Sequence, residues 1–221
     1  ATVLSGVYPE LGGHDEVEDQ LKRLDAEALV HPDDGVEPTY AFRHVVTQEV
    51  AYESMPYAFR SLLHERCGRY LEQAEPDAVE RSLDLLAHHY GRSENLAKKC
   101  EYLARAGEAA QATYANAAAI AYFEQLVPLV EAGPRIEALL KLGKVLELVG
   151  EWSRAEKVVV EALGLAQHLG DRLACAGCET ALAETARKQG RYDEAVERLE
   201  RAARDFLTLG DDAGVGRVLH L

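Results

Sequence analysis

Positive charge is scarce in this chain of 221 residues. Lysine and arginine number 24 against 38 aspartates and glutamates, which leaves a formal net charge of −14 at pH 7. A surface that negative repels phosphate backbones and anionic lipid headgroups. The composition therefore argues against nucleic acid and against a membrane as partners.

Long apolar runs are also missing. No stretch approaches the roughly 18 uninterrupted apolar residues that a membrane-spanning helix requires, and residues 1–10 lack the charged segment and apolar run of a secretion signal. We therefore expect a cytoplasmic protein. Because the sequence starts at Ala1 and stops at Leu221 inside an expected helix, we also expect a fragment of a longer protein.

Motifs of catalysis are absent as well. A phosphate-binding loop needs Gly-x4-Gly-Lys-Ser/Thr, whereas Gly143-Lys144 is followed by Val145 within an expected helix. No spacing singles out a nucleophile with a base and an orienting carboxylate. We predict no catalytic residue, no cofactor and no enzymatic activity in this part of the protein.

Cysteine is sparse, with four residues that do not make a disulfide framework, so Cys67 and Cys100 are expected to be thiols. Cys175 and Cys178 have the spacing of a metal or redox pair, and His168 is near enough in sequence to add a ligand. A structural zinc site needs four ligands, usually from two such pairs, and there is no second pair. We favour small residues on a closely packed helix and no metal, and keep a metal- or thiol-dependent site as the alternative function.

What the sequence does contain is an internal repeat, with matching positions 40 residues apart. The matched residues are Leu142, Gly143, Gly150, Trp152, Ala155 and Ala162 in one copy and Leu182, Ala183, Gly190, Tyr192, Ala195 and Ala202 in the next. An earlier copy has Tyr114 in place of the turn glycine and Asn116 in place of the aromatic, and a further copy opens at Asp211 and is cut off by the end of the chain.

Each copy reads as a helix, a turn with glycine, and a second helix. Small residues such as Gly143 and Ala155 let two antiparallel helices approach closely, and we expect Trp152 and Tyr192 to fill the wedge left at the turn. A hairpin of this kind cannot bury both faces alone, so neighbouring hairpins stack. The pattern predicts an all-α protein with a right-handed superhelix of helical hairpins.

These residues resemble the tetratricopeptide repeat family over residues 98–221, with periods of 36 and 40 instead of the usual 34 or so. The resemblance implies a concave face, lined by the first helices, that binds a protein or peptide segment or the rest of the same chain. Projecting the repeat pattern places the following charged residues on that face: Arg105, Glu108, Lys144, Glu147, Glu184 and Arg187. Their mixed signs favour a polar or charged partner segment, although an ordinary solvated helix face explains each residue singly almost as well.

Residues 1–75 show a different pattern. Val17, Leu21, Leu24 and Leu29 mark an amphipathic helix, and the Pro, Asp and Gly of HPDDGVEP predict a turn with a strand on either side. Helices follow near VTQEVAYESM and FRSLLHERCGRYLEQ, which suggests a small winged-helix-like unit. A bridging helix is expected within residues 76–97, with its joint at Glu75-Pro76-Asp77.

A second resemblance concerns the segments TYAFRHVVTQEVAYESM, RSLLHERCGRYLE, LAHHY and YLARAGEAA. The residues that carry it are Tyr40, Phe42, Arg43, His44, Tyr52, Arg60, Leu63 and His64. They look like the segment that joins the nucleotide-binding module of bacterial signal-transduction ATPases to their repeats. The resemblance implies a non-catalytic regulatory region, possible linkage to an adenylate or guanylate cyclase, and any ATPase or cyclase activity outside these residues. A transcriptional regulator's effector domain is the other alternative.

Three remaining features of the sequence have plain structural explanations. A winged helix suggests DNA binding, but residues 1–75 hold 6 basic against 15 acidic residues, which leaves few phosphate contacts. His88 and His89 point about 100° apart on a helix, so we expect one to pack inward and one to face water. His44 and His64 are expected to hydrogen-bond between the hairpin and its following helices.

Overall fold

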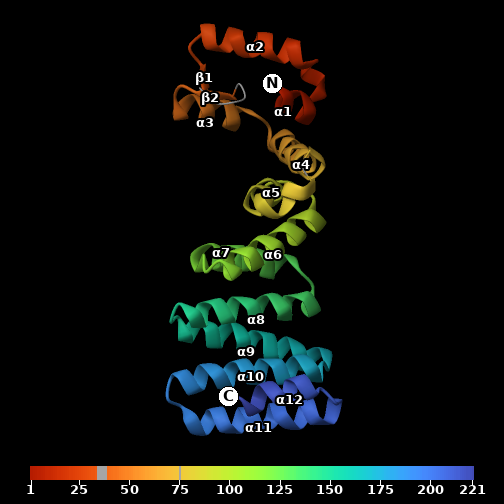
Figure 1. Ribbon diagram of the computed structural model, residues 1–221, viewed down its shortest axis with the longest axis vertical. Helices are drawn as coiled ribbons and strands as arrows, with labels where there is room; N and C mark the ends of the chain where they lie inside the picture. Colours follow the sequence, from red (N-terminus) through yellow and green to blue (C-terminus); the bar gives the residue numbers. More distant parts are fainter. Residues whose placement is uncertain (34–38, 75) are drawn as a thin grey trace. The chain divides into compact units, whose positions relative to one another are not determined.

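The computed structural model describes residues 1–33, 39–74 and 76–221 and is mostly helical (Figure 1). It divides into two compact units, Ala1–Tyr102 and Leu103–Leu221. The all-α class, the helical-repeat superhelix and the small β-hairpin near the N-terminus are confirmed. Residues 34–38 of the predicted turn and Glu75 of the predicted joint lie outside the described residues.

The N-terminal unit follows the predicted order of helix, hairpin and helices. Its elements are α1 (Thr2–Val7), η1 (Pro9–Leu11), α2 (His14–Ala26), β1 (Val30–Asp33), β2 (Thr39–Phe42), α3 (Val45–Ser54), α4 (Tyr57–Ala74), η2 (Pro76–Ser82), α5 (Leu83–Gly91) and the start of α6 (Leu96–Ala112). β1 and β2 are antiparallel, with Val30 opposite Phe42. Whether this unit is a winged helix stays a prediction.

Local chemistry explains these elements. Val17 and Leu21 lie one turn apart on α2 and are both buried, as the spacing of an amphipathic helix requires. Arg43, directly after β2, donates from Nε to the backbone oxygen of Val30 at 3.0 Å and from Nη2 to Asp25 at 3.0 Å. This arginine therefore ties the hairpin to the end of α2.

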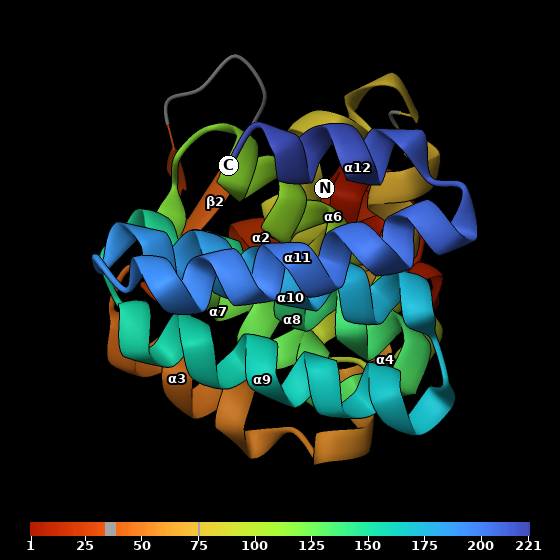
Figure 2. The ribbon, with the colours of Figure 1, turned by 90° about the horizontal axis from the view of Figure 1, so that it is seen from below.

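The C-terminal unit is a series of antiparallel helical hairpins. After the remainder of α6 it contains α7 (Asn116–Leu126), η3 (Val127–Leu129), α8 (Ala132–Leu148), α9 (Trp152–Leu169), α10 (Arg172–Lys188), α11 (Tyr192–Leu209) and α12 (Asp212–Leu219). Figure 1 shows α8 to α11 layered one upon the next, and Figure 2 shows α12 beside α11.

Small residues sit where the helices of a hairpin meet, as predicted. Gly143, Ala155, Ala183 and Ala195 are all buried. A Cβ on Gly143 would lie 2.6 Å from Cγ2 of Val159, much closer than two carbon atoms can pack. Glycine is therefore required for α8 to approach α9 at this distance.

Neighbouring hairpins share one core, which is the reason that the units occur in series. Buried Leu139 of α8, Ala162 of α9 and Leu182 of α10 belong to a single apolar cluster. A second cluster joins Ala202 and Phe206 of α11 to α10 and α12. Each second helix is thus packed both against its own partner and against the next hairpin.

The turns also repeat, at half the 40-residue period. Gly150, Gly170, Gly190 and Gly210 all have φ between 69° and 80°, the left-handed region that favours glycine. Tyr114, which replaces the turn glycine in the earlier copy, has φ 59°. The degenerate copy therefore keeps the turn conformation with a residue for which it is strained.

One expectation about the turns is wrong. Trp152 and Tyr192 do not fill a wedge between helices, because their exposed fractions are 41% and 66%. Each is the first residue of its helix, α9 or α11. Since Cα–Cβ bonds tilt toward a helix's N-terminus, a side chain at this position extends past the helix end and into solvent.

Candidate partner-binding face

The six residues predicted on the concave face lie on the first helices of successive hairpins. Arg105 and Glu108 are on α6, Lys144 and Glu147 on α8, and Glu184 and Arg187 on α10. Ion pairs join these helices in sequence, because Lys141 of α8 binds Glu108 and Lys144 binds Glu184. The structure therefore places Glu108 beside α8, and Lys144 beside Glu184 of α10.

Charged side chains of α8 and α10 form a compact network. Lys144 Nζ lies 3.2 Å from Glu147 Oε1 and 3.0 Å from Glu184 Oε1. Lys188 Nζ lies 2.5 Å from Glu147 Oε1 and 3.4 Å from Glu184 Oε1. The network pairs two ammonium groups with two carboxylates, so it adds no net charge to this face.

Glu147 is the buried member of the network, with a side-chain exposed fraction of 4%. Besides both lysines, it accepts a hydrogen bond from Thr185 Oγ1 at 3.3 Å. A buried carboxylate is stable only when it is paired and hydrogen-bonded. Glu147 therefore joins two repeats internally and is not presented to a partner as a free side chain.

The network shifts the pKa of its members. Burial alone would raise the pKa of Glu184, but hydrogen bonds and charges from Lys144 and Lys188 outweigh it and lower the pKa. Burial would lower the pKa of Lys144, yet its bonds to Glu184 and Glu147 raise it. Both groups are therefore held in their charged forms.

Arg187 is the exposed cation among the six predicted residues. Within the described part of the chain it forms no ion pair that would compete with a binding partner. Sequence reasoning missed Lys188 and Thr185. Lys188 follows Glu184 by four residues, the spacing of helical ion pairs, and this signal was available. Its bond to Glu147, 41 positions earlier in the chain, required the tertiary structure.

The surroundings of the two cysteines of the CxxC segment raise the pKa of both thiols. Burial is the main cause: it raises the pKa of Cys178 to about 12, with smaller effects of Cys175 and of nearby carboxyl groups, and with carboxyl groups it raises the pKa of Cys175 above its ordinary value. Reactive thiols need a lowered pKa. His168 lies exposed near the end of α9, and within residues 1–33, 39–74 and 76–221 no group of three or more His, Cys, Asp or Glu side chains is placed to hold a metal ion.

The predictions for the histidines are confirmed only in part. His89 is half-buried and His88 is exposed, as predicted for neighbours on one helix. His64 bonds Tyr52 of α3 and His89 of α5, so it joins helices to one another, and the predicted bond to the hairpin is wrong for it. The same prediction is wrong for His44, which lies exposed at the start of α3 without a capping hydrogen bond.

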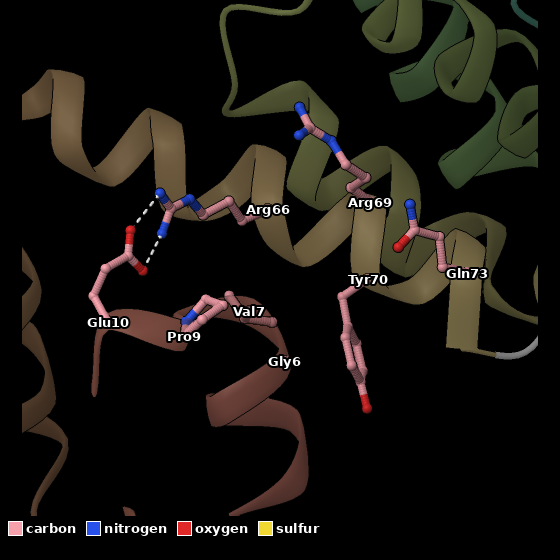
Figure 3. Close-up of a pocket in the computed structure, with 8 residues that line it drawn as sticks. All are labelled: Gly6, Val7, Pro9, Glu10, Arg66, Arg69, Tyr70 and Gln73. Carbon is pink, nitrogen blue, oxygen red and sulfur yellow. Dashed lines mark hydrogen bonds and ion pairs between the residues drawn. The ribbon is translucent and has the colours of Figure 1, made fainter. Parts of the chain in front are cut away.

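Cavities lie among the described residues of the N-terminal unit. One of about 280 Å³ is lined by residues of α1, η1 and α4, and Figure 3 shows the Arg66 guanidinium in it bound to both carboxylate oxygens of Glu10 at 2.8 Å. Another, of about 680 Å³, is mostly apolar and lies between α1, α2 and the β-hairpin, with Leu21, Leu24 and Phe42 in its wall.

Of the helices that the structure describes, none is long and apolar enough to cross a membrane.

Comparisons with known proteins agree with this architecture. The family model described as tetratricopeptide repeat matches residues 135–207, which contain most of α8, all of α9 and α10, and most of α11. No curated protein matches the chain.

Several solved structures have a similar fold. A signal-transduction ATPase with numerous domains (STAND) that has a tetratricopeptide repeat sensor, from Pyrococcus horikoshii, is 16% identical with a TM-score of 0.59 over 79% of this chain and 28% of that one. A Rap protein complexed with competence and sporulation factor is 16% identical with a TM-score of 0.54 over 76% of this chain and 49% of that one. A putative kinesin light chain with tetratricopeptide-like repeats from Podosopora anserina is 12% identical with a TM-score of 0.53 over 90% and 91%.

The chain thus spans about a quarter of the ATPase and half of the Rap protein. Identities this low establish the fold alone. The family-model match, the buried small residues and the glycine turns lead to one conclusion. Residues 135–207 are a tetratricopeptide repeat region within a superhelix of helical hairpins.

Proposed function

We propose that this chain is a non-catalytic regulatory region that binds a protein or peptide segment on the face formed by α6, α8 and α10. The observation that carries the proposal is the ion-pair connection from Glu108 through Lys141 to α8, and from Lys144 to Glu184 on α10. It supports one continuous charged strip across three first helices. Repeat arrays of this kind use such extended surfaces for recognition.

The charges of the strip define the partner's chemistry. Lys144 and Lys188 are bound to Glu147 and Glu184, which leaves Arg187 as the exposed guanidinium beside a neutral network. A guanidinium binds a carboxylate in a bidentate manner, through two parallel N–H···O hydrogen bonds. We infer that the partner segment carries an acidic residue near Arg187 and polar residues along the network.

The wider context is a multidomain bacterial signalling ATPase. The resemblance of the segment with Phe42, Arg43 and His44 supports it, as does the similar fold of a STAND protein with a repeat sensor. The partner is then another protein or the rest of the same chain, and cyclase linkage stays a prediction. The raised thiol pKa values of Cys175 and Cys178 argue against the thiol-dependent alternative.

A displayed library of random peptides, selected on the full 221-residue chain, tests the proposal. Selected peptides should contain Asp or Glu, and Arg187→Glu should weaken their binding at least tenfold, since an attractive charge becomes repulsive. Lys157→Glu, which makes the same charge change on an exposed position of the second helix α9, is the matched control. Equal affinities for both variants, or no selectable peptide, would contradict the assignment of the face.

A further inference from the structure

Three imidazoles meet where α4 packs on α5 in the N-terminal unit. His64 of α4 has its ring centroid 5.8 Å from that of His88 and 5.2 Å from that of His89, both on α5. The Nδ1 atoms of His64 and His89 are 3.0 Å apart, a hydrogen-bond distance. The Nε2 atom of His64 lies 2.9 Å from the Tyr52 hydroxyl on α3.

The protonation state decides whether the bond between His64 and His89 exists. A hydrogen bond between two imidazole nitrogens needs one N–H and one lone pair. Two neutral rings, or one neutral ring and one cation, satisfy this requirement. Two imidazolium ions do not, because both nitrogens then carry hydrogen and both rings carry positive charge.

The charged groups around the cluster oppose protonation. Arg92, just after α5, donates to His88 Nδ1 at 3.0 Å, and Arg60 on α4 adds a second positive charge. Arg60 is itself paired with Glu53 of α3 at 2.6 Å.

The elements around the cluster carry further ionisable groups, among them Glu49 of α3 and Arg66 and Glu72 of α4. α5 carries Asp84, η2 carries Glu80 and Arg81, and α4 carries Glu65, which is bound by Arg69 and Asn95; α1 has no ionisable side chain.

The environment lowers the pKa of every histidine in the cluster. Burial is the main cause for His89, followed by the charges of His64, His88 and Arg92, and its pKa falls to about 4. Burial and then nearby cationic groups also lower the pKa of His64 and of His88. The cluster is therefore neutral at pH 7.

We propose that the cluster of His64, His88 and His89 is an acid-sensitive joint, in which protonation of both His64 and His89 breaks the bond between them and releases α5 from α4. The joint is separate from the partner-binding face and does not depend on it. The proposal concerns contacts inside the N-terminal unit.

The direction of the pH effect follows from proton linkage. An imidazole released from the cluster titrates near 6.5, whereas His89 in the closed joint titrates near 4. Between these values the open form binds more protons, so acidification favours opening. The stability contributed by the cluster is complete above about pH 6.5 and is lost as the pH falls toward 4.

Amide hydrogen exchange on the full chain tests this inference. Protection factors of buried Leu86 and Ala87 on α5 should fall about tenfold from pH 7 to pH 5, after correction for the intrinsic exchange rate. This window lies above the ordinary titration range of carboxyl groups. In parallel, the histidine Hε1 NMR signal of His89 should titrate near pH 4, and that of His64 below its ordinary value of about 6.5.

A non-titrating variant separates the proton effect from a merely structural one. His89→Gln keeps a polar side chain of similar reach but cannot become a cation, so its α5 protection should change less than threefold over the same pH range. His168→Gln, at an exposed position of α9, should keep the tenfold change. If His64 and His89 of the unaltered protein titrate near pH 6.5 or above, or if His89→Gln retains the tenfold change, the inference is wrong.

Discussion

Gly143 and Val159 are in such close apposition that a single methyl group on Gly143 would lie 2.6 Å from Cγ2 of Val159. Val159 is buried and its β-branched side chain has little freedom to turn away. Gly143→Ala should therefore push α8 from α9 and reduce the free energy of unfolding by about 1–3 kcal/mol. Urea denaturation followed by circular dichroism measures the change.

Gly164 on α9 provides the matched control, because a Cβ there meets nothing within 4 Å. Gly164→Ala should raise the free energy of unfolding by about 0.5–1 kcal/mol through helix propensity. A stabilising Gly143→Ala would show that the hairpin does not depend on this close approach.

Tyr114 occupies a left-handed turn with φ 59° where the later copies have glycine. Its side chain is 79% exposed, so little packing is lost when it is removed. Tyr114→Gly should therefore raise the free energy of unfolding by about 1 kcal/mol. In thermal denaturation Gly150→Ala, which puts a Cβ on a turn with φ 80°, should have the opposite sign.

Glu147 and Lys188 should be energetically coupled, because they connect α8 to α10 through a buried carboxylate. Glu147→Ala should reduce the free energy of unfolding by about 2 kcal/mol, between the values for exposed and fully buried pairs. A double-mutant cycle with Lys188→Ala should give a coupling energy of about 1 kcal/mol. Additive effects of the two substitutions would exclude a contribution of this ion pair.

Glu72 is the acceptor of a cluster in the N-terminal unit. Tyr90 and Tyr102 donate their hydroxyls to it at 2.8 and 2.5 Å, and Lys98 lies 2.8 Å away. Burial alone would raise the pKa of Glu72, but these three bonds outweigh it and lower the pKa. Its contribution to stability is therefore present above its unfolded pKa and is lost as the pH falls through the folded pKa.

Glu72→Gln should lower the free energy of unfolding by about 1–2 kcal/mol at pH 7, and by much less at pH 3. Urea denaturation at both pH values measures this difference. Glu94→Gln, a change at an exposed position of the same unit, should have little effect at either pH. A loss for Glu72→Gln that is independent of pH would contradict a role for its negative charge.

The repeat architecture could be predicted from short-range patterns. Gly150 and Gly190 mark turns because only glycine adopts φ near 80° without strain, and Ala155 and Ala195 mark contacts because only small residues allow close helices. Trp152 was misplaced because its spacing gives its helix position but not the direction of its side chain at the helix start.

The helices that carry the candidate residues could be predicted, but the ion pairs of these residues could not. Helical periodicity assigns Lys144 and Glu184 to the first helices, and the structure places them there as a bonded pair. Nothing in the local sequence of Glu147 indicates that it is buried beneath Lys188. The hydrogen bond between His64 and His89 likewise could not be predicted from the spacing of residues in the sequence, because the two residues lie on different helices.

The sequence by itself determined the helices, their turns and the small residues at which they touch, since these depend on backbone conformation and on spacing within a few residues. Only the tertiary structure decided which charges are neutralised and which histidines share a hydrogen bond. Such pairings join side chains from separate helices, and their distances and burial are set by the packing of whole helices against one another.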